Sequence, residues 1–102
     1  MSIGVSIVED SDQLRATLAR VIQRAEGFHC VQHYADAEAA LEGVPKEPPD
    51  VVLMDINLPG MNGVECVRKL KQQVQGIQLM MLTVYEDTEN IFAALAAGAS
   101  GY

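Results

Sequence analysis

Three carboxylates that could bind a cation, together with one hydroxyl, stand at the ends of the apolar stretches of this sequence. They are Glu9, Asp10, Asp55 and Thr83. If the stretches are parallel strands of one sheet, their carboxyl ends meet at a single edge, which is where ligands bind in open α/β sheets. Three carboxylates held close together repel one another and raise each other's pKa unless a cation lies among them. Oxygen ligands from separate loops, with room left for water, suit Mg²⁺ better than a zinc or calcium cage.

Each of these residues also has a purely structural explanation. Asp is common in the turns that follow strands, which would account for Asp55. Glu9 and Asp10 could stabilise the positive N-terminus of the helix that follows them. Thr83 could simply fill a strand end as a β-branched residue. Their joint occurrence on three separate strand ends favours a shared site.

The elements that position these residues alternate between strand and helix. Strands are expected at 3–8, 28–34, 51–55 and 77–82, and residues 99–102 look like the start of a fifth. Helices are expected after Ser11 or Asp12, after Asp36, after Asn62-Gly63 and after Asp87 or Thr88. The alternation predicts an α/β fold, a doubly wound sheet of parallel strands joined by right-handed crossovers.

Burial can be predicted for three of these elements. The apolar run 51–54 lies between proline-containing turns, which indicates a central strand covered on both faces. Gln32 and His33 interrupt the stretch 28–34, which suits an edge strand. Helical spacing in the first helix predicts an inward apolar face, formed by Leu14, Leu18, Val21 and Ile22.

Length and composition limit the class of protein. A chain of 102 residues forms one domain, and its net charge of −7 repels phosphate backbones, which argues against nucleic-acid binding by this segment. The sequence contains no run of 18 apolar residues, so no membrane span is predicted. No signal peptide is visible either, and a cytoplasmic location is therefore expected. Cys30 and Cys66 lack the spacing of a zinc or redox motif.

Four segments of the sequence resemble the receiver domain of two-component response regulators. They are Val8-Glu9-Asp10, residues 54–63 (MDINLPGMNG), Leu82-Thr83 and residues 98–102 (GASGY). The resemblance runs along the whole chain and implies a flavodoxin-like fold with strand order 2-1-3-4-5. It is strongest to receivers of the LuxR/NarL kind, which implies a helix-turn-helix output domain and a role in transcription regulation for the parent protein.

The resemblance also implies a role for each site residue. Asp55 would be the phosphoacceptor, taking a phosphoryl group from a sensor histidine kinase. The Mg²⁺ site would be formed by Glu9, Asp10, Asp55 and the backbone carbonyl of Asn57. Asp10 would be a direct ligand, and Glu9, where the family more often has Asp, would act through a metal-bound water. Thr83 would be the switch hydroxyl and Tyr102 the aromatic switch residue on the face of the fourth helix and fifth strand. The domain would promote its own phosphorylation and dephosphorylation, yet would be a signalling domain and not an enzyme.

The family places a lysine shortly after the aromatic residue, and the sequence stops at Tyr102 before it. Helix 5 and most of strand 5 would be lacking too, leaving several apolar side chains uncovered at about 1.5 to 3 kcal/mol each. We therefore expect residues 1–102 to be a C-terminally incomplete receiver domain. It would be a fragment of a longer chain, or would pair as a homodimer or element-exchanged oligomer.

Two other functions stay open at this point. A receiver fold that has lost its switch would be a phosphorylation-independent interaction module. A small-molecule binder or phosphatase of flavodoxin-like fold is the third possibility. No Gly-rich phosphate loop or DxD pair follows the first or third strand, which disfavours it.

Overall fold

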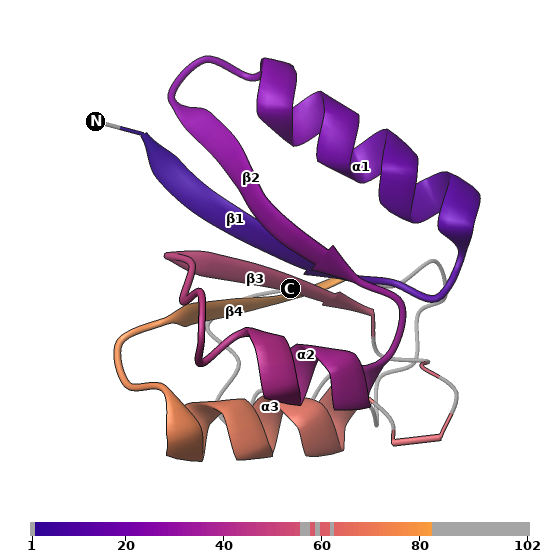
Figure 1. The fold of residues 1–102 in the computed structure, drawn as a ribbon, viewed down its shortest axis with the longest axis vertical. Helices are drawn as coiled ribbons and strands as arrows, with labels where there is room; N and C mark the ends of the chain where they lie inside the picture. The colour runs from indigo at the N-terminus through magenta and orange to yellow at the C-terminus, as the bar shows by residue number, and fades with distance from the viewer. Residues whose placement is uncertain (1, 56–57, 59, 62, 83–102) are drawn as a thin grey trace.

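The computed structural model describes residues 2–55, 58, 60–61 and 63–82. The elements in chain order are β1 (Ile3–Val8), α1 (Asp12–Arg24), β2 (Phe28–Tyr34), α2 (Ala37–Gly43), β3 (Val51–Asp55), α3 (Gly63–Gln73) and β4 (Gln78–Leu82). All strand pairs are parallel, in the order β2-β1-β3-β4 (Figure 1). This confirms the predicted α/β sheet and the edge position of β2. The expected fourth helix and fifth strand lie outside the described residues.

The helices begin where capping residues satisfy the free amides of the first turn. The Ser11 hydroxyl accepts a hydrogen bond from the amide of Leu14 over 3.3 Å, and the Asp36 carboxylate accepts one from Ala39 over 2.7 Å. Both predicted helix starts are confirmed. Gly27, with φ of 86°, turns the chain from α1 toward β2. Among the helices of the described residues, none is long and apolar enough to cross a membrane.

The register of the strands brings their carboxyl ends to one level. Val8 of β1 lies opposite both Tyr34 of β2 and Met54 of β3. Asp55, the last residue of β3, lies opposite Leu82, the last residue of β4. The residues that follow β1 and end β3 therefore share one edge of the sheet.

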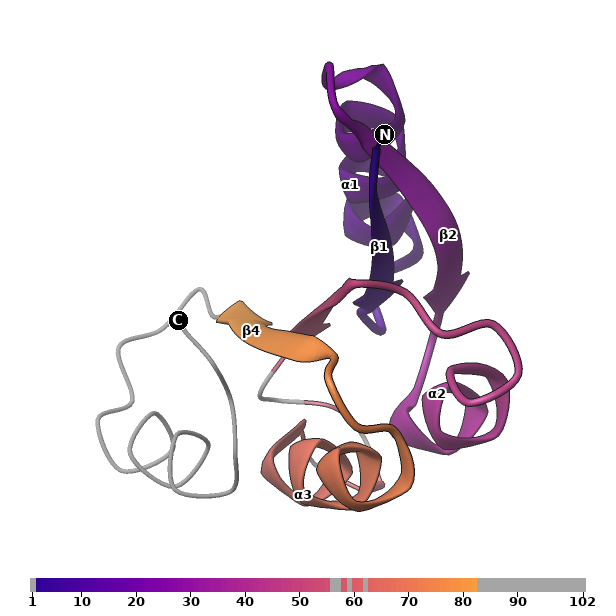
Figure 2. The same cartoon turned by 90° about the vertical axis from the view of Figure 1, so that its left-hand side faces the viewer.

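The main hydrophobic core lies between the sheet and the neighbouring helices α2 and α3 (Figures 1 and 2). Val52 and Met54 of β3 are fully buried there against Val67 and Leu70 of α3. The other members are Val8, Ala37, Ala40, Val44, Leu58, Val64, Cys66, Ile77, Leu79 and Met81. The regular alternation of buried residues in β3 reflects the period of two along a strand.

The opposite face of the sheet is covered less completely, and here the prediction that β3 is covered on both faces was wrong. None of the residues of α1, all of which are described, is buried, and Val21 is 60% exposed. Val51 and Leu53 of β3 are only half-buried, so that strand is fully covered on one face and not on both. The reason is that α1 packs mainly beside β1 and β2, at one side of the sheet (Figure 1).

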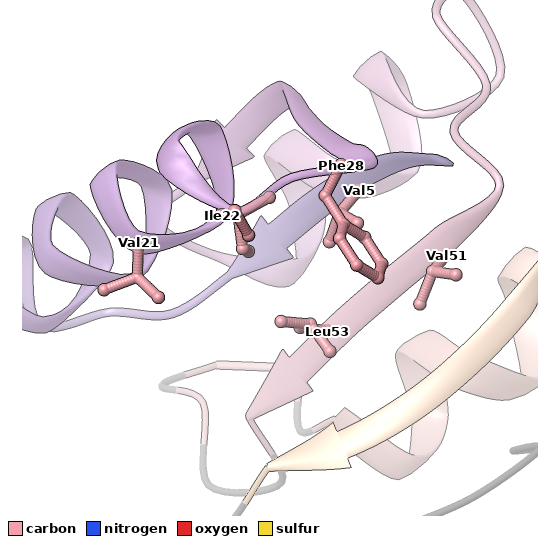
Figure 3. A pocket seen from close by; sticks show the side chains of 7 residues that line it. Val5, Val21, Ile22, Phe28, Val51 and Leu53 are labelled. Atoms are coloured by element: carbon pink, nitrogen blue, oxygen red, sulfur yellow. The ribbon is translucent and has the colours of Figure 1, made fainter. Parts of the chain in front are cut away.

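An apolar groove opens between α1 and β3 as a result (Figure 3). Its volume is about 260 Å³, and it is lined by Val5, Val21, Ile22, Ala25, Phe28, Val51 and Leu53. The lining residues come from β1, α1, the start of β2 and β3. The groove is thus a property of how these elements pack and could not be located from helix periodicity alone.

Candidate functional site

Three carboxylates gather at the carboxyl ends of β1 and β3. Glu9, Asp10 and Asp55 each offer one oxygen atom, and these atoms all lie within 4.8 Å of one another. Glu9 is buried, Asp55 is half-buried and Asp10 is exposed, so the cluster reaches from the interior to the surface. Oxygen atoms at this separation can coordinate a single small cation that is open to solvent on one side.

Glu9 is held in place from three directions. Its backbone amide donates a hydrogen bond to the carbonyl of Tyr34 over 3.0 Å, continuing the pairing of β1 with β2. Its carbonyl accepts a hydrogen bond from Nη1 of Arg15 over 2.9 Å. Its carboxylate accepts one from the amide of Ser11 over 3.1 Å. The side chain therefore has little freedom to turn away from the cluster.

Burial is the first cause that raises the pKa of Glu9, which reaches about 7 from an ordinary value of 4.5. A hydrogen bond with Asp10 raises the pKa further, as do the charge of Asp55 and a hydrogen bond with it, while the amide of Ser11 lowers it. A carboxyl group in this setting either keeps a proton or needs a positive charge beside it. The donor set consists of carboxylate oxygens, which are the ligands preferred by Mg²⁺, so the residues present fit that ion.

The structure thus brings together three of the residues singled out from the sequence. Asn57, Thr83 and Tyr102 lie outside the described residues. Their expected roles, as carbonyl ligand, switch hydroxyl and aromatic switch, stay predictions. The same holds for the individual roles of the three carboxylates.

Two contacts around the site were missed by the sequence reasoning. Arg15 reaches back from the first turns of α1 to the carbonyl of Glu9. Glu38 of α2 accepts a hydrogen bond from the amide of Met61 over 3.4 Å, and so connects α2 to the loop after β3. The contact of Arg15 could have been predicted from the sequence, because an arginine stands one helical turn after the N-cap residue Ser11. The second joins positions 23 apart and has no local signature.

The fold and the acidic cluster are those of a receiver domain, and the family comparison agrees. The family model for the response regulator receiver domain matches residues 5–102. The chain belongs to this family of signalling domains, which confirms the resemblance drawn from the sequence motifs.

Two of the relatives carry names that describe them as transcriptional regulatory proteins. The chain is 37% identical over 100 residues to transcriptional regulatory protein DegU of Brevibacillus brevis, covering 98% of this chain and 42% of the relative. It is 35% identical over 100 residues to transcriptional regulatory protein LnrK of Bacillus subtilis (strain 168), covering 98% and 46%. The chain spans less than half the length of these two relatives.

A solved structure of a response regulator has the same fold. A two-component response regulator of the LuxR family from Aurantimonas sp. SI85-9A1 superposes with a TM-score of 0.93 at 31% identity, covering all of this chain and 73% of that one. The predicted likeness to receivers of the LuxR/NarL kind is therefore confirmed.

Proposed function

We propose that this chain is a phosphoacceptor domain in which Asp55 takes a phosphoryl group from a sensor histidine kinase. Mg²⁺ would be held by Glu9, Asp10 and Asp55, with the carbonyl of Asn57 as a further ligand. The observation that carries the proposal is the convergence of three carboxylates within 4.8 Å at the carboxyl ends of two adjacent strands. Membership of the receiver family supports it.

The chemistry follows from the charges at the site. A carboxylate oxygen of Asp55 forms a bond to phosphorus, while the nitrogen–phosphorus bond of the phosphohistidine breaks and its electron pair stays on the imidazole. Both reactants are anionic, and Mg²⁺ bound at this site would supply the positive charge that offsets their repulsion. Glu9 would take part in this site in its ionised form. The aspartyl phosphate adds a charge of about −1.5 to −2 at the end of β3.

The switch would involve Thr83 and Tyr102. Thr83 directly follows Leu82, the register partner of Asp55, which supports a place for it next to the acceptor. Its hydroxyl would donate a hydrogen bond to a phosphoryl oxygen, and the ring of Tyr102 would fill the space that the threonine leaves. Phosphorylation would then bias a two-state equilibrium of the face of helix 4 and strand 5.

The parent protein would be a cytoplasmic transcription regulator with a helix-turn-helix output domain. The names of the curated relatives and the LuxR family of the solved structure support this reading. The open apolar groove supports the further proposal that this chain associates with a second copy, as a homodimer or element-exchanged oligomer. Promotion of its own phosphorylation and dephosphorylation belongs to the same proposal.

The test is intact-mass spectrometry after incubation with acetyl phosphate and Mg²⁺. Wild type should gain one phosphoryl group, and Asp55→Asn should gain none. Asp12→Asn is the matched control, because Asp12 is an exposed carboxylate near the cluster but outside it, and this variant should be labelled normally. A folded wild type that gains nothing would contradict the proposal and favour the phosphorylation-independent interaction module.

The oligomer is tested separately by light scattering on a size-exclusion column. Association with a second copy predicts a mass above that of one chain at micromolar concentration. A stable, monodisperse monomer would contradict the proposed association and leave the phosphoacceptor proposal unaffected.

A further inference from the structure

Arg15 connects helix α1 to the backbone of the acidic site. Its Nη1 donates to the carbonyl oxygen of Glu9 over 2.9 Å, and its Nη2 pairs with Oδ1 of Asp12. The side chain of Arg15 is only 15% exposed, whereas that of Asp12 is 89% exposed. The guanidinium group is therefore packed against the turn between β1 and α1 and does not extend into solvent.

The hydrogen bond from Arg15 matters because it holds the peptide group between Glu9 and Asp10. The carbonyl of Glu9 and the amide of Asp10 form one planar peptide unit, so a donor that fixes the carbonyl oxygen fixes the orientation of the whole plane. The directions in which the side chains of Glu9 and Asp10 leave the backbone depend on that orientation. These are the two carboxylates that this turn contributes to the cluster with Asp55.

We propose that Arg15 is a positioning residue of the cation site, which holds the Glu9–Asp10 peptide so that both carboxylates converge with Asp55. The inference rests on the proposed function, because it takes the ligand of the cluster to be a divalent cation. Arginine suits the role since its planar group donates to two acceptors in a fixed geometry and stays charged at all working pH values. A hydrogen bond from a charged donor is also stronger than one between neutral groups.

A merely structural role for Arg15 can be separated from this one. Its pair with Asp12 is an i,i+3 pair whose acidic partner is exposed, and such pairs contribute little to stability. Asp12→Asn removes this ion pair and leaves the bond to Glu9. Arg20→Met removes a different, exposed arginine from the same helix. Both variants should keep the site intact.

The experiment measures Mn²⁺ binding by electron paramagnetic resonance of the free ion, because Mn²⁺ occupies the same kind of oxygen site as Mg²⁺. Arg15→Met should weaken binding about tenfold, the usual loss when a partner behind a ligand is removed. Arg15→Lys should weaken it less, because the ammonium keeps a charged donor, but should not restore it fully, because one ammonium cannot reproduce the two-pronged geometry. Asp12→Asn and Arg20→Met should bind like wild type. Without metal, the ¹⁵N–¹H shift of the Asp10 amide should move in Arg15→Met but not in Asp12→Asn.

The outcomes are distinguishable. Wild-type affinity in folded Arg15→Met, with an unmoved Asp10 amide, would overturn the inference while leaving the proposed function in place. Absence of Mn²⁺ binding in wild type itself would remove the proposed cation site and the inference with it. If Arg15→Met does not fold, Arg15→Lys decides instead, since weakened binding in that folded variant supports the inference and unchanged binding overturns it.

Discussion

Val8 on β1 and Met54 on β3 are register partners, and an acidic residue follows each of them directly in the sequence. This pairing brings Glu9 and Asp55 to the same level of the sheet. A slip by one residue would also turn Met54, which is fully buried, out of the core. The register that buries the apolar side chains of β3 is thus the register that assembles the acidic cluster.

The raised pKa of Glu9 predicts that stability in metal-free buffer depends on pH. Because the folded pKa of about 7 lies above the ordinary value of 4.5, the folded protein binds more protons than the unfolded chain between these values. The free energy of unfolding should therefore be highest below pH 4.5 as far as this group is concerned, and should fall as pH rises to about 7. We expect a loss of about 2 kcal/mol, since one pKa unit corresponds to about 1.4 kcal/mol and solvent screens part of the effect.

Urea unfolding at several pH values between 5 and 8, in the presence of a chelator, measures this loss. Glu9→Gln is the control, because the amide has nearly the same shape and does not titrate. The difference between wild type and this variant isolates Glu9 from every other titrating group. An equal pH slope in both proteins would show that Glu9 ionises normally.

Addition of Mg²⁺ should stabilise the protein most above pH 7, where Glu9 has lost its proton. A ligand that binds only the folded state raises the free energy of unfolding by about 2.7 kcal/mol at one hundred times its dissociation constant. Asp10→Asn removes one ligand and should lose most of this gain. Thermal unfolding with Mg²⁺ and with chelator measures it. A similar gain in Asp10→Asn would place the cation elsewhere.

The two faces of the sheet should respond differently to the same substitution. Val67→Ala on α3 removes a fully buried side chain and should destabilise the protein by about 2 kcal/mol. Val21→Ala on α1 should change stability by less than about 0.5 kcal/mol, because Val21 is 60% exposed. Both positions are helical, so the difference in helix propensity cancels. A large loss at Val21 in urea unfolding would mean that this face is covered in solution.

Ser6 offers a substitution that should stabilise the fold. Its hydroxyl is fully buried and has no hydrogen-bond partner among the residues that the structure describes. Burial of an unpaired polar group costs about 1 to 3 kcal/mol, so Ser6→Ala should raise the free energy of unfolding by about 1 kcal/mol. Chemical denaturation gives the value directly. A clear loss of stability would show that the hydroxyl has a partner in solution.

The strands and helices could be predicted because their signals are local. The range of β2 is as expected, β4 begins one residue later than expected, and the caps at Ser11 and Asp36 begin their helices as expected. Each of these strands is indicated by the periodic spacing of its apolar residues, and each of these caps by a side chain that reaches an amide three residues away. The convergence of Glu9, Asp10 and Asp55 could be predicted as well, since parallel strands place their carboxyl ends together.

The sequence by itself therefore determined the order of the described elements and the three carboxylates, because spacing along the chain carries that information, and its motifs indicated the family by resemblance. Only the tertiary structure decided that α1 leaves Val21 exposed, that Arg15 reaches the carbonyl of Glu9, and that the pKa of Glu9 rises to about 7. These properties depend on how tightly separate elements pack and how much water they exclude. Such quantities arise from contacts in space, and periodicity along one element does not contain them.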